Sequence, residues 1–330
     1  MTTGVDIYCC SVHDTKSDAS SRDIFPNVVT LLRRVNYHLY TLWLFTYSDL
    51  KTVIYPQLAF GLSNALSGVI TVDRAPSAFA VLARIPLILL WVWFVLFLEV
   101  VANQRLPLSI LEDVKNKPWR PLPSRRLSPR SAQRLLLFSV PIVLMISSFL
   151  GTITLSMAGI TATWMYNDLG GADNSYVARN LLNACGLTIF GAGATTIAAG
   201  GSELNENAAA WFGILACTIF STVQTQDLAD MEGDAARGRK TMPLIHGQSV
   251  TRWSIALFVT FWSLICPYFW NLNKYSYCPS VLVGGLLAFR ALLIRDVGAD
   301  KLTWKIWCIW MIVLYTLPLY KDHRALEACW

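Results

Sequence analysis

The chain has 330 residues, of which 54% are hydrophobic and 15% are charged, and its mean hydropathy is +0.45. Soluble domains carry about a quarter charged residues, so this composition excludes an ordinary soluble domain and indicates helices that face lipid. The formal charge of +6 does not identify a polyanionic partner, because basic residues in a membrane protein first of all orient its loops. The eight cysteines show no CxxC or CxxxH spacing, so we do not expect a zinc site.

The first segment, residues 1–38, is rich in Ser, Thr and Asp and lacks the apolar core of a secretory signal. We expect it to remain attached to the protein as a flexible cytosolic tail. Residues 39–330 are expected to form a single transmembrane domain.

The remaining chain reads as a series of long apolar helices. A helix needs about twenty apolar residues to cross a hydrocarbon core of about 30 Å. Runs of this kind, separated by polar or Gly/Pro breaks, predict an all-α integral membrane protein with nine spans. The first run is long enough to be tilted or broken at Pro56, and the third and fourth share a tight turn near Gly151. The predicted spans are 43–70, 79–102, 135–150, 152–167, 179–199, 208–226, 252–271, 279–295 and 303–320.

The charges between the spans predict the orientation. Nine spans with a cytosolic amino terminus place the long segments 103–134 and 227–251 on the cytosolic side. The cytosolic segments hold most of the basic residues, whereas the opposite joins hold only Arg74 and Lys274, as the positive-inside rule requires. A helical bundle of this orientation fits the endoplasmic reticulum membrane.

The strongest chemical pattern follows the sixth predicted span, where Asp227, Asp230 and Asp234 are spaced i, i+3 and i+7. On a helix all three point the same way. Clustered carboxylates repel one another unless a hard cation binds them, and Mg²⁺ binds through a few carboxylates plus substrate phosphates. Arg239 and Lys240 follow and supply a site for the anion. The pattern predicts one half of a magnesium-bridged phosphate site, and the alternative is a solvated acidic loop.

The other long loop again couples acids to bases. Glu112 and Asp113 can hold a metal ion, with Asn103 as a neutral oxygen ligand. Lys117 and Arg120 can neutralise diphosphate oxygens. Taken alone, this loop could equally be an ordinary basic loop on the cytosolic side. Because it lies on the same side of the membrane as the Asp227 cluster, we predict that it forms the second half of the site.

The two loops resemble those of the UbiA superfamily of intramembrane prenyltransferases. Members carry two Asp-rich loops, the first followed by an NKPxRP-like stretch and the second reading close to DxxDxxGD; this chain has NKPWRP from Asn116 and DLADMEGD from Asp227. The resemblance covers nearly all of the chain from about Tyr40. It implies nine helices bundled around a central cavity, and an enzyme that binds a prenyl diphosphate with Mg²⁺.

The first loop departs from the family pattern in one respect. The usual loop reads NxxxDxxxD, but counting back from Asp113 puts Ser109 at the middle acid and Arg105 at the Asn. Together with FTYSDLKTVIYPQLAFGLSNA from Phe45 and YNDLGGAD from Tyr166, this is similar to the fungal branch of UbiA-type membrane terpene cyclases. The resemblance implies a cyclase of secondary metabolism that ionises farnesyl or geranylgeranyl diphosphate and closes the cation to a sesquiterpene or diterpene hydrocarbon.

Two other functions stay open. A prenyltransferase would use the same ionisation site and pass the prenyl group to an aromatic or other acceptor. A cation transporter would need carboxylates near the midplane, yet the central parts of the predicted spans are almost free of acids, apart from Asp49 near an entrance. We expect a prenyl diphosphate and the lipid bilayer as partners, and no nucleic acid.

Polar side chains inside the spans are candidates for the wall of the cavity. Ser63 and Asn64 lie in the first predicted span and Asn183 in the fifth. Amides at such depth generally face the interior of a helix bundle. They either touch the substrate or form hydrogen bonds between helices.

Overall fold

The computed structural model describes residues 28–73 and 75–321, which form helices and turns with one isolated β-bridge between Thr71 and Leu204. The chain divides into two units, residues 1–40 and residues 41–330. Of the predicted flexible tail, residues 1–27 lie outside the described residues. From Val28 onward the chain forms the helix α1 (Val28–Thr46), a stretch that contains neither Gly nor Pro and is far less polar than the segment before it.

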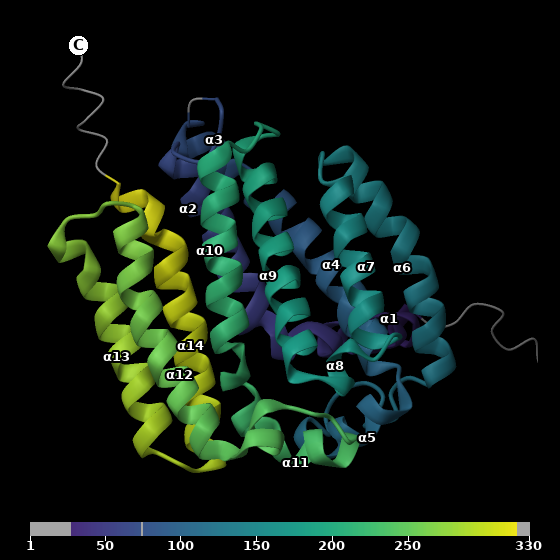
Figure 1. Cartoon of the computed structure of the whole chain (residues 1–330). Coiled ribbons are helices and arrows are strands. Elements are labelled where there is room, and N and C mark those ends of the chain that lie inside the picture. The colour runs from purple at the N-terminus through teal and green to yellow at the C-terminus, as the bar shows by residue number, and fades with distance from the viewer. Residues whose placement is uncertain (1–27, 74, 322–330) are drawn as a thin grey trace, which may run out of the picture. The chain divides into compact units, whose positions relative to one another are not determined.

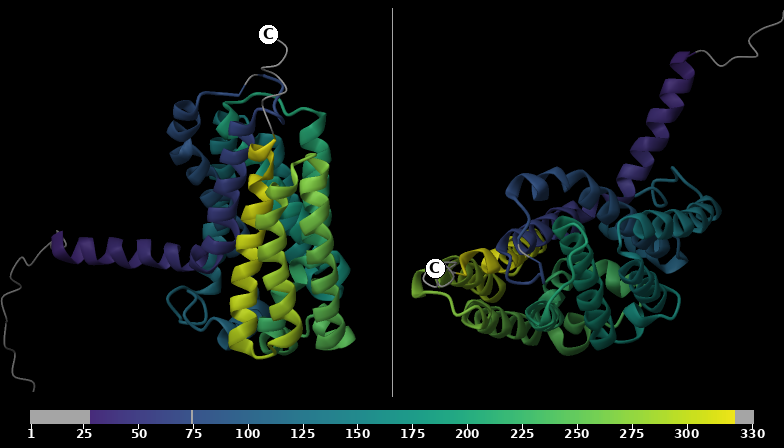
Figure 2. Two further views of the ribbon diagram at one scale, coloured as in Figure 1. Left: turned by 90° about the vertical axis from the view of Figure 1, so that its left-hand side faces the viewer. Right: turned by 90° about the horizontal axis from the view of Figure 1, so that it is seen from above.

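The second unit is a bundle of long helices that run roughly alongside one another and are joined by turns at both ends (Figures 1 and 2). Its elements after α1 are η1 (Tyr47–Asp49), η2 (Leu50–Ile54), α2 (Tyr55–Ser67), α3 (Ala78–Ala83), α4 (Ile85–Gln104), α5 (Pro107–Asn116), α6 (Pro129–Phe149), α7 (Ile153–Asn167), α8 (Gly171–Asn174), α9 (Tyr176–Ala199), α10 (Glu206–Thr222), η3 (Val223–Thr225), α11 (Asp227–Arg237), α12 (Met242–Phe269), η4 (Lys274–Tyr277), α13 (Cys278–Leu293), α14 (Val297–Thr316) and η5 (Leu317–Tyr320).

Seven helices of the described chain are long and apolar enough to cross a membrane, namely α4, α6, α9, α10, α12, α13 and α14, three of them counted with a short adjoining 3₁₀ turn. They correspond to seven of the nine predicted spans. The other two are shorter. The predicted span 43–70 contains α2, a helix of 13 residues, and the predicted span 152–167 is α7, a helix of 15 residues. The count of nine is therefore not confirmed. The first run does not continue as one regular helix, because it passes from α1 through η1 and the π-helix η2, and Asp49 leaves helical φ/ψ values (−104°, 4°). No break occurs at Pro56: Ile54 and Tyr55 before it keep helical values, and Pro56 lies in the first turn of α2, where a missing N–H is tolerated.

Large apolar side chains cover much of the outside of the bundle. Phe138 and Phe149 on α6 are 65% and 85% exposed, and Leu282 and Leu293 on α13 are each 66% exposed. Exposed apolar side chains in this number are unfavourable in water and favourable in lipid. Together with the seven long helices, it makes the protein an integral, multi-pass membrane protein.

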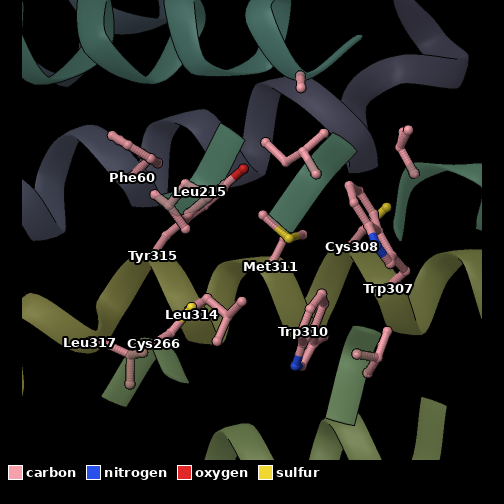
Figure 3. Close-up of a cluster of buried hydrophobic side chains, with 14 of the residues drawn as sticks. Phe60, Leu215, Cys266, Trp307, Cys308, Trp310, Met311, Leu314, Tyr315 and Leu317 are labelled. Carbon is pink, nitrogen blue, oxygen red and sulfur yellow. The ribbon is translucent and has the colours of Figure 1, made fainter. Parts of the chain in front are cut away.

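Aromatic side chains of α14 form the centre of one hydrophobic cluster (Figure 3). Tyr315 packs edge-on against Phe60 of α2, with 4.6 Å between the ring centroids. Trp310 is fully buried, and its Nε1 donates to the Ser263 hydroxyl of α12 at 2.9 Å. Large rings with satisfied polar groups thus fix α14 against its neighbours.

Small residues let other helices approach one another closely. A Cβ added at Gly61 of α2 would lie 2.7 Å from the backbone oxygen of Ala194 in α9. A Cβ at Gly193 would lie 2.1 Å from the ring of Trp91 in α4. Close backbone contact of this kind is a principal source of helix association in lipid, where apolar burial alone provides little driving force.

Gly61→Ala is expected to destabilise the protein, because the added methyl group meets the backbone of α9, which cannot move without separating the helices. Overpacking of this kind costs about 1–3 kcal/mol. The temperature of half-unfolding in detergent should fall accordingly. Gly213→Ala in α10 is the matched control, because nothing lies within 4 Å of a Cβ there. Equal midpoints for the two variants would contradict this account of the contact between α2 and α9.

Candidate active site

Two short helices, α5 and α11, carry the acids of the two predicted loops, and they lie together at one end of the bundle (Figure 1). They approach so closely that a Cβ at Gly233 would lie 2.2 Å from Nδ2 of Asn116. Asn116 also donates from Nδ2 to the backbone carbonyl of Asp230 at 3.3 Å. The two loops therefore form a single region of the protein.

Asp227, the first acid of α11, is fully buried. Arg179, at the start of α9, donates from Nη2 to Asp227 Oδ1 at 2.7 Å. The same guanidinium donates to the hydroxyl of Tyr166. An unpaired buried carboxylate costs several kcal/mol, so Arg179 is the residue that allows Asp227 to be charged in this position.

Asp234, the last acid of α11, belongs to a second and larger ion-pair network. Arg239 Nη1 lies 2.7 Å from Asp234 Oδ1 and 3.1 Å from Glu112 Oε1. Arg237 Nη1 lies 3.0 Å from Glu112 Oε2. Asp173 accepts from both guanidiniums, at 3.1 Å from Arg237 Nη2 and 3.2 Å from Arg239 Nε. This network connects α5, α8 and α11.

Asp113 of α5 has a bidentate partner in the proline-rich stretch that follows it. Arg120 Nη1 lies 2.8 Å and 3.1 Å from the two Asp113 carboxylate oxygens. Arg120 Nη2 donates to Ser48 at 2.9 Å and lies 3.7 Å from Asp49. Both Ser48 and Asp49 lie in η1, directly before the π-helix. Arg120 thus connects the first loop to the broken first span.

The ion pairs leave part of the acidic cluster available to a metal ion. Oδ2 of Asp227 and Oδ2 of Asp234 are buried and have no hydrogen-bond partner among residues 28–73 and 75–321. Free carboxylate oxygens are the ligands that Mg²⁺ prefers, so these two acids fit such an ion. No group of three or more His, Cys, Asp or Glu side chains is arranged around a common metal position in the described part of the chain. The protein alone therefore offers a partial coordination shell.

A cavity opens beside this region and continues between α4, α7 and α9. Its polar wall includes Asp230 and the cations Lys117, Arg120, Arg179 and Arg239. Its apolar wall comes from the helices, and contributes Val95, Leu96, Leu187, Ile189, Phe190 and Trp304. The cavity thus has a charged section next to the two loops and an apolar section inside the bundle.

The residues predicted from the sequence divide into two sets. Residues in the cavity wall are Asn103, Glu112, Lys117, Arg120, Asn183, Asp230 and Arg239. Residues outside the wall are Ser63, Asn64, Asp113, Asp227, Asp234 and Lys240.

Each of the outside residues has its own surroundings. The three aspartates are buried and take part in the ion pairs described above. Lys240 has an exposed side chain. Asn64 is buried in α2 and donates to Thr195 of α9 at 3.4 Å, which is the hydrogen bond between helices that was the alternative to substrate contact. Ser63 is buried in the same helix.

Comparison with known proteins agrees with this architecture. The model of the UbiA prenyltransferase family matches residues 74–312. The chain belongs to this family. A solved structure of a UbiA homolog from Archaeoglobus fulgidus, bound to GPP and Mg²⁺, superposes with a TM-score of 0.57 over 81% of this chain and 98% of that chain, at 14% identity, and so shows the shared fold.

Two curated relatives are terpene synthases. Fumagillin beta-trans-bergamotene synthase of Aspergillus fumigatus is 34% identical over 87% of this chain and 94% of its own length. Somaliensene A/B synthase of Streptomyces somaliensis is 30% identical over 88% of this chain and 96% of its own length. The protein is thus similar along nearly its whole length to UbiA enzymes that form terpenes.

Several residues of this UbiA site were not singled out from the sequence. Arg179 pairs with Asp227, and the signal available for it was a charged residue at the polar start of a predicted span. Asp173 pairs with Arg237 and Arg239, and its signal was its place in the YNDLGGAD stretch. Glu99 lines the cavity from within α4. It is an exception to the expectation that the spans are almost free of acids apart from Asp49.

Burial controls the protonation of the acidic cluster. It raises the pKa of Asp227 despite the opposing effect of Arg179. Burial, opposed by Arg179 and reinforced by the Asp227 carboxylate, raises the pKa of Asp234 to about 7. Burial acts in the same direction on Glu112, but Arg239 and Arg237 outweigh it and hold its pKa below the usual value. Asp227 and Asp234 therefore bind protons more readily than free carboxylates do.

The metal-free protein is expected to lose stability as pH rises from about 4 to about 7. Over this range folded Asp234 keeps a proton that the unfolded chain has released, so the free energy of unfolding falls with pH. Mg²⁺ should compete with that proton and stabilise the protein more at pH 8 than at pH 5. The measurement is the midpoint temperature of unfolding in detergent as a function of pH, once with a chelator present and once with Mg²⁺ present.

Asp234→Asn should flatten the pH dependence of the unfolding midpoint measured with chelator, because the variant lacks the carboxyl group that titrates. Glu232→Gln is the matched control, since that side chain lies on the same helix but is 78% exposed. If Asp234→Asn and Glu232→Gln showed the same slope, Asp234 would not be the group responsible.

Proposed function

We propose that the protein is a magnesium-dependent terpene cyclase that ionises farnesyl or geranylgeranyl diphosphate and closes the allylic cation to a cyclic hydrocarbon. The two terpene synthases that resemble the chain over nearly its whole length support this reaction. The altered first loop, with Ser109 in place of the middle acid of the common family pattern, supports the cyclase branch.

The observation that carries the proposal is the division of the cavity into a cationic section and an apolar section. Lys117, Arg120 and Arg239 stand in the wall close to Asp230, where a diphosphate and its metal ions would be held. The apolar walls of α4 and α9 would surround the prenyl chain. One cavity therefore suits both ends of a prenyl diphosphate.

Each part of the site has a role in this reaction. Asp230 and the free oxygens of Asp227 and Asp234 would hold Mg²⁺, with diphosphate oxygens and water completing its shell. The metal, when bound, withdraws charge from the leaving group. Lys117 and Arg120 would hold the released diphosphate at the charged end. The apolar wall keeps water away from the cation, which water would otherwise capture as an alcohol.

Asn103, Glu112 and Asp113 are proposed to support the first half of the site, in different ways. Asn103 donates from Nδ2 to Asn167 at 2.7 Å, which leaves its amide oxygen in the cavity wall. Glu112 lies in the wall but is already shared between Arg237 and Arg239. Asp113 would act through Arg120, whose guanidinium it orients.

A prenyltransferase that passes the prenyl group to an acceptor is the second candidate, because the family model carries that description. Ionisation would proceed in the same way in both, so the acceptor distinguishes them. We further propose that the end of the bundle carrying α5 and α11 faces the cytosol in the endoplasmic reticulum membrane, which the basic residues of the two loops support.

The decisive experiment supplies membranes containing the protein with farnesyl or geranylgeranyl diphosphate and Mg²⁺, without an acceptor, and analyses hydrocarbons by gas chromatography. A cyclic hydrocarbon is expected from one of the two substrates. Asp230→Asn should reduce it by about 100-fold or more, because lost charge stabilisation at the ionisation step is worth several kcal/mol.

Glu232→Gln, two residues further along α11 and exposed, should leave the yield unchanged. Prenylation that appears only when an aromatic acceptor is added, with no hydrocarbon in its absence, would reject the cyclase and leave the prenyltransferase.

A further inference from the structure

Glu99 is a carboxyl group inside the membrane-spanning part of the cavity wall. It lies on α4 one turn before Asn103, so the helix rise places it about 6 Å further from the loops. Val95 and Leu96, one turn further again, line the apolar section. Glu99 thus lies at the border between the charged and apolar sections, where a prenyl chain would pass. Ionisable groups at such depth are costly and generally functional.

The other acids of this wall differ from Glu99 in their partners or their position. Asp49 accepts from Ser48 at 2.7 Å and lies 3.7 Å from Arg120. Glu112 is shared by two arginines. Asp230 lies on α11, with the acids proposed to hold metal. For Glu99, the described residues provide neither an ion pair nor a hydrogen bond, although the side chain lines the cavity. Its carboxyl group is therefore available to a bound molecule.

The proposed cyclisation needs a base at such a position. The C–O bond breaks with both electrons leaving on diphosphate, and a double bond of the same chain attacks C1, which forms a C–C bond and moves the positive charge to another carbon. The sequence ends when a C–H bond next to that carbon gives up its proton and its electron pair becomes a new double bond. The proton acceptor must therefore lie beside the hydrocarbon chain and away from water.

We propose that Glu99 is the base that accepts this terminating proton; the inference rests on the cyclase function proposed above. A carbocation next to the carboxyl group favours its deprotonated form, so the group is able to accept a proton at the stage when the proton must leave. After the hydrocarbon departs, the proton passes from Glu99 to released diphosphate, which restores the carboxylate.

Other groups of the wall suit this step less well. Tyr166 accepts a hydrogen bond from Arg179 and faces a cation. Asn183 is an amide and has no useful basicity. Diphosphate itself is the main rival, because its oxygens are basic, but Arg120 and Arg239 hold it at the charged section in the proposed site. Glu99 lies one helical turn from Val95 and Leu96 of the apolar section, and it is a carboxyl group without an arginine partner among the described residues.

Glu99→Gln tests the role, because it keeps the size of the side chain and removes its basicity. Two quantities are measured in the same membranes: diphosphate released from substrate without an acceptor, and cyclic hydrocarbon formed. Diphosphate release is expected to stay within about threefold of the unaltered protein. Hydrocarbon formed per diphosphate released should fall at least about tenfold, with alcohols or other alkenes in its place.

Glu99→Asp is the second variant, since it keeps the carboxylate and moves it back by one methylene. It should recover part of the hydrocarbon yield that Glu99→Gln loses. Glu232→Gln is again the control of equal chemistry, on an exposed side chain.

Unchanged hydrocarbon per diphosphate in Glu99→Gln would overturn the inference and leave diphosphate as the base. Proportional loss of both quantities in both variants would also overturn it, because Glu99 would then serve folding or ionisation. If the unaltered protein released no diphosphate and formed no hydrocarbon without an acceptor, the proposed cyclase function itself would fail. The two failures are therefore distinguishable.

Discussion

Pairing of buried carboxylates with arginines is the interaction on which the site of this UbiA protein depends. Asp227 and Asp234 lie out of contact with water, where an uncompensated charge would be strongly destabilising. Arg179 reaches the first from α9, and Arg239 reaches the second from the chain after α11. These bonds fix α11 against the bundle. The two halves of the site are held in place by electrostatics at a position that apolar packing alone could not specify.

The same pairing shapes the cavity. Each arginine uses one oxygen of Asp227 or Asp234 and leaves the other free, while the guanidiniums of Arg120, Arg179 and Arg239 line the charged section. Carboxylates and guanidiniums that lie close together at this end of the cavity form a surface that suits a metal ion together with a diphosphate. A short distance along α4 the wall becomes apolar. This change in polarity within one cavity is what an ionisation reaction followed by a protected cation requires.

Packing of the helices provides the rigid support for this arrangement. Gly61 of α2 lies against the backbone of α9, and Gly193 of α9 leaves room for the ring of Trp91. Trp310 and Tyr315 of α14 pack in the same hydrophobic cluster as Phe60 of α2 (Figure 3). Interiors packed to this density resist deformation. The ion pairs at the end of the bundle therefore act between fixed elements.

The sequence by itself determined the membrane class, seven of its nine predicted spans and the helical spacing of Asp227, Asp230 and Asp234, because apolar length and residue periodicity are local properties. It did not determine which side chains face one another. Arg179 pairs with an acid 48 positions away, and the partner of Asn64 lies 131 positions away. The division between cavity wall and buried support, and the short α2 and α7, were decided by tertiary structure. Periodicity identifies residues on one face of a helix, whereas the helix opposite that face is set by packing of the whole bundle.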